Sequence, residues 1–196
     1  MSQNNRSLYL KYAAALSHPG DFSSNIAIFF NEDADINVVH PFNQLKGAEI
    51  YLNEFLVPLQ HSFEGLYRRD DIFIAGEFEG QNWISSTGYY VGQFVGDWIG
   101  IKATKSLSYL RYGEFHRIEN GKAVESYIYL DIPELMIACN QWPLDMGPGD
   151  SRGYTGLIQG PASRDGVLKS YSDPVEGQQS YQIVTDMLDK LATKDE

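Results

Sequence analysis

Hydrophobic and polar residues follow two different periods along this 196-residue chain, and the period changes near residue 60. Before that point, apolar residues recur at the one-turn spacing of amphipathic helices, interrupted by one stretch that alternates as a strand does. We predict three helices and one strand here, over residues 6–16, 21–30 and 47–56 for the helices and 35–40 for the strand. Pro58 should end the third helix, because proline lacks the N–H that an interior helical residue donates.

From residue 60 onward, the spacing of apolar residues changes to the two-residue period of strands. We predict strands over residues 69–75 and 83–94, then a hairpin over 106–130 and a short helix after it. Helices therefore come first and antiparallel strands follow, which indicates an α+β fold in which helices cover one face of a curved sheet. Such a cone-shaped sheet should leave an apolar pocket at its wide end.

The hairpin carries its own turn signal at residues 119–121, Glu-Asn-Gly, where a glycine in third place fits a type I turn closed by a left-handed bulge. A three-residue loop places Glu114 opposite Ser126 and brings the even-numbered residues of both strands onto one face. We take this even face as the inner one, because it carries the apolar set of the second strand. A two-residue loop would shift the register by one and turn Tyr127 and Tyr129 inward instead of outward.

Three polar side chains, those of Tyr112, Glu114 and His116, lie on the predicted inner face among apolar neighbours. Buried polar groups need hydrogen-bond partners or water. Glu114 and His116 either satisfy each other near the rim of the sheet or act as the polar groups of a pocket. The sequence leaves both interpretations open.

Asp131 ends the second hairpin strand, and its neighbours indicate a structural role. The run from Asp131 to Glu134 combines an N-cap acceptor, a proline in the first turn and a glutamate at the third helical position. We predict a capping box that opens the following helix. Cys139 lies on the apolar side of that helix, so we expect a buried, unreactive thiol.

The charge balance narrows the classes of partner. The chain has 15 basic and 26 acidic side chains and a net charge of -11, which argues against binding to nucleic acid or to an anionic membrane. No apolar run approaches the roughly 20 residues that a transmembrane helix requires, and residues 1–6 are too polar for a secretory signal. We therefore expect a cytoplasmic protein. One cysteine, and four histidines without ligand spacing, argue against a metal site.

Glycine and proline become frequent after residue 141, yet aliphatic and aromatic residues continue. We predict one α+β cone domain over residues 1–142 and an extension over 143–196 that packs on the domain or on a partner subunit. The extension should be largely irregular. It should end in a helix opened by Asp173-Pro174, with Val184, Met187, Leu188 and Leu191 on one side.

With these elements in place, residues 8–142 resemble the SnoaL-like polyketide cyclases of the nuclear transport factor two (NTF2)-like superfamily. The resemblance rests on short runs in the order His40-Pro41-Phe42-Asn43, Gly47, Trp83, Thr87-Gly88-Tyr89-Tyr90-Val91-Gly92, Trp98-Ile99-Gly100-Ile101, Arg111-Tyr112-Gly113-Glu114-Phe115, Asn120-Gly121-Lys122 and Leu130-Asp131. It implies a cone-shaped fold, a homodimer formed through the outer face of the sheet, and acid–base chemistry without a cofactor on polyketide-derived rings.

The chain departs from this family at the catalytic positions that the resemblance implies. The family's acid–base aspartate, seven residues after the turn glycine, corresponds to Ile128, and the cyclase histidine seven residues before it corresponds to Glu114. Glu114 among apolar neighbours should have a raised pKa suited to acid–base work, with His40 or His116 as its partner.

Two functional hypotheses follow. The first is a cofactor-independent, cyclase-like enzyme acting on a hydrophobic, carbonyl-bearing small molecule, with Glu114, His116 and His40 as catalytic residues. Its pocket would be lined by Tyr112, Ile128, Trp83, Tyr89 and Trp98. The second is a small-ligand-binding or assembly module without chemistry, which the isoleucine at position 128 favours.

Overall fold

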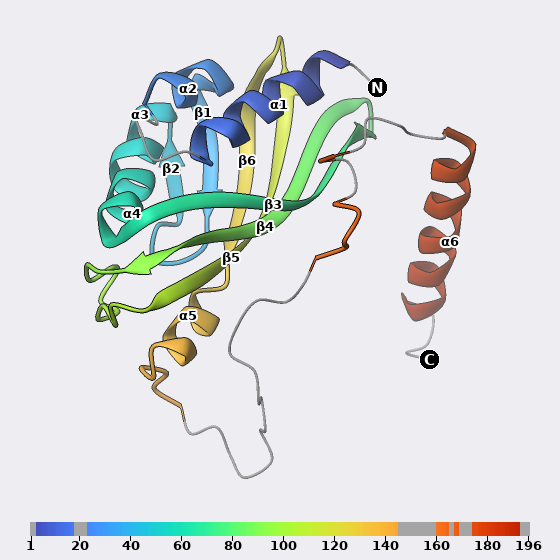
Figure 1. Cartoon of the computed structure of the whole chain (residues 1–196). Coiled ribbons are helices and arrows are strands. Elements are labelled where there is room, and N and C mark those ends of the chain that lie inside the picture. The colour runs from blue at the N-terminus through green and yellow to red at the C-terminus, as the bar shows by residue number, and fades with distance from the viewer. Residues whose placement is uncertain (1–2, 18–22, 145–159, 165–166, 169–173, 193–196) are drawn as a thin grey trace.

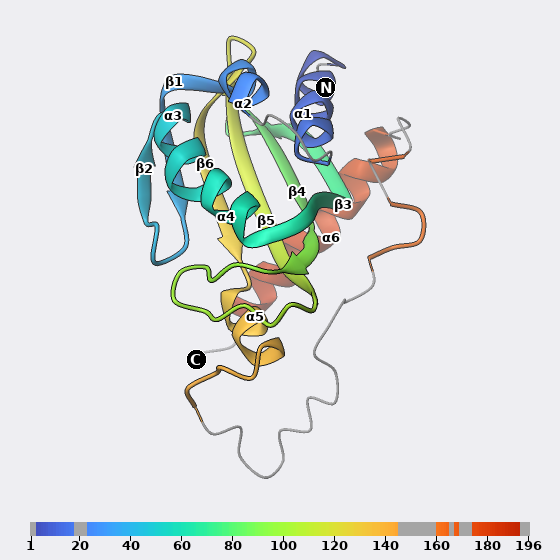
Figure 2. The same cartoon turned by 60° about the vertical axis from the view of Figure 1, so that its left-hand side comes forward.

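The computed structural model describes residues 3–17, 23–144, 160–164, 167–168 and 174–192. A six-stranded sheet carries helices α1 to α4 on one face, while α6 stands on the opposite side of the sheet (Figures 1 and 2). The elements, in chain order, are α1 (Gln3–Leu16), α2 (Ser23–Phe29), β1 (Phe30–Val38), β2 (Gln44–Lys46), α3 (Ala48–Tyr51), the π-helix η1 (Leu52–Leu56), α4 (Val57–Ser62), β3 (Phe63–Phe78), β4 (Gln81–Phe94), β5 (Leu107–Glu119), β6 (Lys122–Leu130), α5 (Ile132–Ala138) and α6 (Pro174–Ala192). This is the α+β fold that the order of helices and strands predicted.

The strands follow one another in the order β2-β1-β6-β5-β4-β3. The strands from β3 to β6 form an antiparallel meander, and β1 joins it by pairing in parallel with β6. The long strands bend over α1 to α4 and leave β3 at one edge of the sheet (Figure 2). The core fills the space between this curved sheet and the helices, and the inner faces of β4, β5 and β6 supply much of it.

The inner face of the hairpin is the even-numbered one, as predicted, but the turn differs from the predicted three-residue loop. Glu119 pairs directly with Lys122, so the loop has two residues, Asn120 and Gly121, both with positive φ. A two-residue loop without any other irregularity would have turned the odd-numbered residues of the second strand inward. A β-bulge leaves Val124 without an opposite residue and restores the parity, so Tyr127 and Tyr129 stay outside.

The predicted register was therefore two residues off. Glu114 lies opposite Ile128, and Ser126 lies opposite His116. Ile128, where the resemblance would place an aspartate, therefore directly faces Glu114 across the hairpin. An aspartate at 128 would have pointed into the same inner layer as Glu114.

Pro58 does not end the third helix, contrary to the prediction. The chain widens into the π-helix η1 directly before it, and α4 continues with Pro58 in its first turn. A proline is tolerated in the first turn of a helix because its missing N–H is not needed there. The wider π turn thus lets the helical segment run on to Ser62.

Two predicted strands have other bounds in the structure: those predicted over 35–40 and 69–75 are observed as β1 (Phe30–Val38) and β3 (Phe63–Phe78), and β2 was not predicted. Asp131 caps α5 by accepting a hydrogen bond from the Glu134 backbone N–H at 3.1 Å, which confirms the predicted capping role. Cys139 is buried, and burial raises the pKa of its thiol, as expected for an unreactive cysteine. His18 and most of the glycine- and proline-rich stretch lie outside the described residues. Among the described helices, none combines the length and apolar character needed to cross a bilayer.

Candidate functional site

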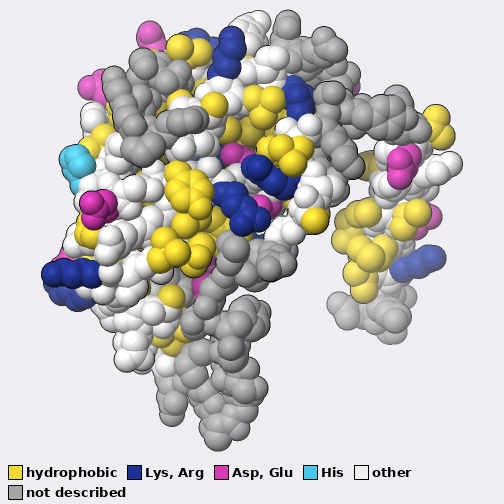
Figure 3. Space-filling view, viewed as in Figure 1, with side chains coloured by type: hydrophobic (Ala, Val, Ile, Leu, Met, Phe, Trp, Pro, Cys, Tyr) yellow, Lys and Arg dark blue, Asp and Glu magenta, His cyan; other side chains and the backbone are white. Residues whose placement is uncertain are grey.

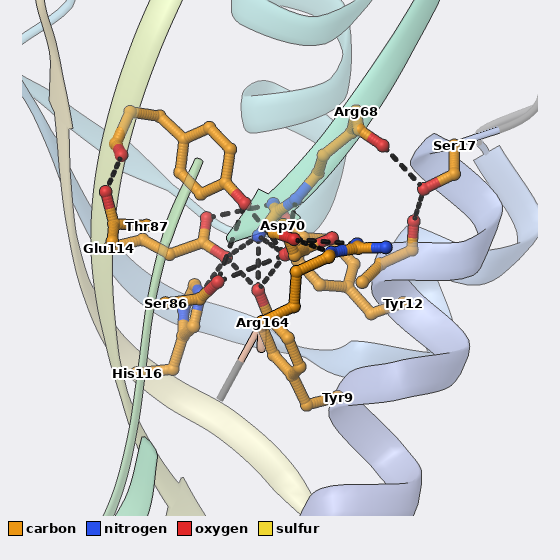
Figure 4. A network of polar contacts seen from close by, with 12 residues as sticks. Tyr9, Tyr12, Ser17, Arg68, Asp70, Ser86, Thr87, Glu114, His116 and Arg164 are labelled. Carbon is orange, nitrogen blue, oxygen red and sulfur yellow. Dashed lines mark hydrogen bonds and ion pairs between the residues drawn. The ribbon is translucent and has the colours of Figure 1, made fainter. Parts of the chain in front are cut away.

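A cluster of charged and hydroxyl-bearing side chains fills the centre of the inner face. Arg68 and Asp70 come from β3, Ser86 from β4, Glu114 from β5 and Tyr9 from α1 (Figure 4). The strands contribute even-numbered residues because each strand presents every second side chain to the inside. We call this group, together with Tyr112 of β5, the Arg68 cluster.

The Arg68 guanidinium is completely buried and is held by two carboxylates. Its Nη1 donates to Glu114 Oε2 at 3.1 Å, and its Nη2 donates to Asp70 Oδ1 at 2.9 Å and also to Glu114 Oε1. The guanidinium carbon lies 4.1 Å from the centre of the Tyr112 ring, which is within cation–π range. A buried cation is tolerated only when it is paired and hydrogen-bonded in this way.

Hydroxyl groups complete the bonding of the two carboxylates. Asp70 Oδ1 accepts from Tyr112 OH at 2.7 Å, from Tyr9 OH at 2.8 Å and from Ser86 Oγ at 3.1 Å. The Tyr9 hydroxyl also lies 3.0 Å from Glu114 Oε1. Burial raises the pKa of both tyrosines, so they remain neutral donors to the carboxylates.

The expected rise in the pKa of Glu114 is wrong. Burial by itself would raise the pKa, but Arg68 and His116 outweigh burial and lower it to about 2. The pKa of Asp70 is also lowered, because Arg68 and the tyrosine hydroxyls offset its burial. Both carboxylates are therefore ionised near neutral pH, and neither holds a proton for general-acid work.

The depressed pKa of Glu114 predicts an acid-sensitive fold. In the unfolded chain the carboxyl takes up a proton near its ordinary pKa of 4.5, whereas in the folded chain it does so only near pH 2. The contribution of Glu114 to the free energy of unfolding should therefore be constant above about pH 5.5 and fall by on the order of 3 kcal/mol as the pH drops from 5 to 2. Urea titrations across this range should show a flatter pH dependence for Glu114→Gln, at lower stability near pH 7. Glu64→Gln, at an exposed position of β3, is the control and should keep the wild-type slope; a wild-type slope in Glu114→Gln would contradict the assignment.

His116 is buried next to the Arg68 cluster. Its Nδ1 lies 2.8 Å from Ser126 Oγ, and its Nε2 lies 3.3 Å from Glu114 Oε1. The rings of Phe29 and Phe30 pack edge-on against the imidazole. The predicted contact between Glu114 and His116 is thus present, deep in the core and not at the rim of the sheet.

The other predicted site residues are dispersed. Ile128 is buried on the inner face, and Trp98 is buried against Phe42 and Phe55, away from the polar groups of the cluster. Exposed His40 follows β1 and makes none of the hydrogen bonds or ion pairs that hold the cluster together.

Trp83 and Tyr89 are not part of an inner pocket. Both are odd-numbered residues of β4 and pair with Arg117 and Arg111, so they belong to the outer face. The structure therefore places Trp83 and Tyr89 on the side of the sheet away from Glu114, because Ser86 lies opposite Glu114 and fixes the parity of β4.

Sequence reasoning missed Arg68, Asp70 and Tyr9. The run from Arg68 to Asp71 reads as a solvated charge pair followed by its counter-ions, because charged residues are almost never fully buried unless paired. The alternation Leu66-x-Arg68-x-Asp70 was the available signal. It places both charges on the same side of the strand as a core leucine.

Two backbone carbonyls next to this cluster also accept hydrogen bonds from side chains. The Ser17 hydroxyl donates to the Arg68 carbonyl at 2.9 Å, and the Arg164 guanidinium donates to the Asp70 carbonyl at 2.7 and 2.9 Å (Figure 4). Arg6 Nη2 donates to the Val167 carbonyl at 3.2 Å. Arg164 and Val167 of the extension are therefore anchored beside β3 and α1.

An apolar hollow that described residues line lies on the outer face of the sheet. It has a volume of about 610 Å³, and we call it the outer groove. Its apolar lining consists of Ile74 and Phe78 of β3, Trp83 of β4, Phe115 of β5 and Tyr127 and Tyr129 of β6. Glu114 and His116 do not line it. Within the described residues, no group of three His, Cys, Asp or Glu side chains is arranged to hold a metal ion.

A scan against protein-family models finds no match, and a search of curated proteins finds none. Solved structures do resemble the chain. A candidate SnoaL-like polyketide cyclase from Jannaschia sp. CCS1 is 15% identical, with a TM-score of 0.60 over 74% of this chain and 98% of that protein. TsrD from Streptomyces laurentii is 15% identical, with a TM-score of 0.59 over 72% of this chain and 98% of its own. An NTF2-like protein from Burkholderia thailandensis E264 is 14% identical, with a TM-score of 0.54 over 71% and 99% of the two chains. The chain therefore has the α+β fold of the SnoaL-like and NTF2-like proteins.

Proposed function

We propose that this protein is a binding module of the NTF2-like fold that works without acid–base chemistry. The observation that carries the proposal is the bonding of Glu114: Arg68 holds both of its carboxylate oxygens, and the side chain is fully buried. A general base needs a free lone pair within reach of the substrate and a pKa near the working pH. Glu114 has neither, and the neighbouring Ile128 supplies no second carboxylate.

The outer groove is the binding surface in this proposal. Its volume of about 610 Å³ falls in the range of roughly 300–1,000 Å³ that is usual for ligand sites. Five of its apolar side chains are between 36% and 63% exposed: those of Ile74, Phe78, Phe115, Tyr127 and Tyr129. A contiguous apolar surface of this kind on a soluble domain marks an interaction site.

A neutral solvatochromic dye, Nile red, tests whether the groove binds apolar molecules. Dilute wild-type protein should bind the dye with a saturable rise in dye emission and a change in Trp83 fluorescence, because Trp83 lines the groove. Phe115→Asp should weaken binding about 10-fold or more, since a buried carboxylate replaces an aromatic contact. Leu107→Asp places the same charge at an exposed apolar residue of β5 outside the groove lining and is the control. Equal loss in both variants, or none in either, would contradict the assignment of the groove.

A cyclase-like enzyme is the second candidate. It is favoured by the 3.3 Å approach of His116 Nε2 to Glu114 Oε1 beside tyrosine hydroxyls, and by the likeness to candidate polyketide cyclases. This mechanism requires Arg68 to release Glu114 when substrate binds. Turnover of a carbonyl-bearing aromatic substrate by the wild type, abolished in Glu114→Gln, would establish the enzyme and overturn the binding module.

A further inference from the structure

We propose that the occupant of the outer groove is helix α6 of a second copy of this chain. The inference rests on the proposed function, because it names the partner of the same groove. Each chain then gives its helix to its partner and receives the partner's helix in return.

Helix α6 has an apolar side that the single chain leaves uncovered. Tyr181, Val184, Leu188 and Leu191 recur at three- and four-residue spacing, and Met187 adjoins them. These five side chains are 50% to 58% exposed, and Figure 3 shows apolar side chains gathered on α6. Helices in proteins are stabilised mainly by the packing of their apolar side. The described helix therefore requires a surface to cover that side.

The apolar side of the helix matches the groove in length. The 19-residue helix is about 28 Å long at 1.5 Å per residue, and its apolar side from Tyr181 to Leu191 covers about 15 Å of that length. The groove spans β3, β4, β5 and β6, which cover about 14 Å at the usual strand spacing of about 4.8 Å. The helix can thus lie across all four strands and contact the full set of exposed groove residues.

The extension carries α6 toward this side of the sheet. Arg164 and Val167 are fixed beside β3 and α1, and α6 begins six residues after Leu168. Six extended residues reach about 20 Å at most. β3 contributes Ile74 and Phe78 to the groove, so the helix leaves the domain next to the strand that lines one side of it. In the single chain, however, both apolar surfaces remain exposed, so the chain's own groove does not take its own helix.

A reciprocal dimer covers both surfaces in both copies. The contact between the helix of one chain and the groove of the other occurs twice, related by a two-fold axis. The assembly therefore closes at two chains. A stable interface buries about 1,200–2,000 Å² in total, and each of the two contacts then needs to bury only about 600–1,000 Å². The polar side of α6, where Gln182 donates to Asp186 at 2.7 Å, remains in water.

The first test is the mass of the full-length protein in solution, measured by light scattering or sedimentation at micromolar concentration. The wild type should be a dimer. Leu188→Asp, on the apolar side of α6, and Phe115→Asp, in the groove, should each weaken the dimer about 100-fold or more, because each places a charge in the centre of the contact. Gln179→Asp adds the same charge at an exposed position on the opposite side of α6, two and a half turns before Leu188, and should leave the dimer intact.

Mixing the two disruptive variants separates exchange between chains from every other arrangement. In a mixed pair, the intact helix of the Phe115→Asp chain meets the intact groove of the Leu188→Asp chain, so one of the two contacts is restored. A heterodimer that forms only on mixing supports the proposal. A wild-type monomer, or a dimer that neither variant disturbs, overturns it.

Dye binding keeps this inference distinct from the proposed function. If α6 of the partner fills the groove, Nile red should bind poorly to wild-type protein at concentrations where it is dimeric. It should bind better to wild-type protein diluted to monomer and to Leu188→Asp, whose groove is vacated. Strong dye binding by an undisturbed wild-type dimer would overturn the helix exchange while leaving the groove as a small-molecule site. Absence of dye binding in Leu188→Asp, with normal folding, would contradict the groove itself.

Discussion

Arg68→Met is expected to destabilise the protein by about 3–5 kcal/mol, the usual cost of removing one partner from a buried ion pair. The substitution leaves Asp70 and Glu114 ionised in the core without their cation, while the tyrosine hydroxyls alone cannot neutralise two charges. Methionine has an unbranched, flexible side chain like that of arginine. The loss of stability therefore reflects the missing charge more than a change in side-chain volume. Urea unfolding followed by circular dichroism at pH 7 measures it.

Arg117→Met is the matched control on the same sheet. Arg117 of β5 pairs with Glu119 and Glu125, but these partners are partly or largely exposed to water. Such pairs contribute about 0–1 kcal/mol. Adding Glu114→Gln to Arg68→Met should recover part of the lost stability, because it removes one of the two stranded charges. Similar losses in Arg68→Met and Arg117→Met would show that the cluster does not hold the core together.

Gly88→Ala should cost about 3 kcal/mol or more, at the upper end of what overpacking costs. A Cβ atom at this position would lie 1.9 Å from the Arg69 carbonyl oxygen and 2.8 Å from the Tyr112 hydroxyl. The close approach arises from a β-bulge: Gly88 pairs with Asp70 while Thr87 pairs with Ile72, so the backbone of β3 comes nearer to β4. Backbone atoms cannot move aside cheaply, and the Tyr112 hydroxyl is committed to Asp70.

Gly113→Ala tests whether this cost is specific. Gly113 lies on the neighbouring strand β5, and a Cβ atom there would have no atom within 4 Å. Its replacement should be neutral or slightly stabilising, because alanine restricts the unfolded chain more than glycine does. Thermal unfolding of the two variants should separate them by many degrees. A melting temperature for Gly88→Ala equal to that of Gly113→Ala would mean that the bulge relaxes at little cost.

The sequence was sufficient to predict the fold class and the inner face of the hairpin. Two-residue alternation decides which side of a strand is buried, and the capping run at Asp131 decides where the last strand ends. The register was not predictable in the same way. The turn is one residue shorter than its glycine suggested, and the compensating bulge at Val124 has no signal in a run of residues that all fit a strand.

The candidate site was predictable only in part, because its contacts join strands that are far apart in the sequence. Alternation placed Glu114 and His116 inside, but it could not show what they meet. Arg68 lies 46 positions before Glu114 in the chain, and its pairing with Glu114 depends on how β3, β4 and β5 are stacked side by side. Arg68 makes the largest contribution that lowers the pKa of Glu114, and His116 adds to it. A carboxylate among apolar residues and a carboxylate beside a buried guanidinium look the same in the sequence of β5.

Strand β3 is an edge strand of the sheet, and exposed edge strands can pair with strands of other chains and start aggregation. The Ser17 hydroxyl and the Arg164 guanidinium occupy the carbonyl oxygens of Arg68 and Asp70, and the bulge between Asp70 and Ile72 interrupts the regular ladder there. An incoming strand would find these acceptors already taken. The residue after α1 and the extension thus each occupy one acceptor on this edge, which lowers its capacity to pair with a strand of another chain.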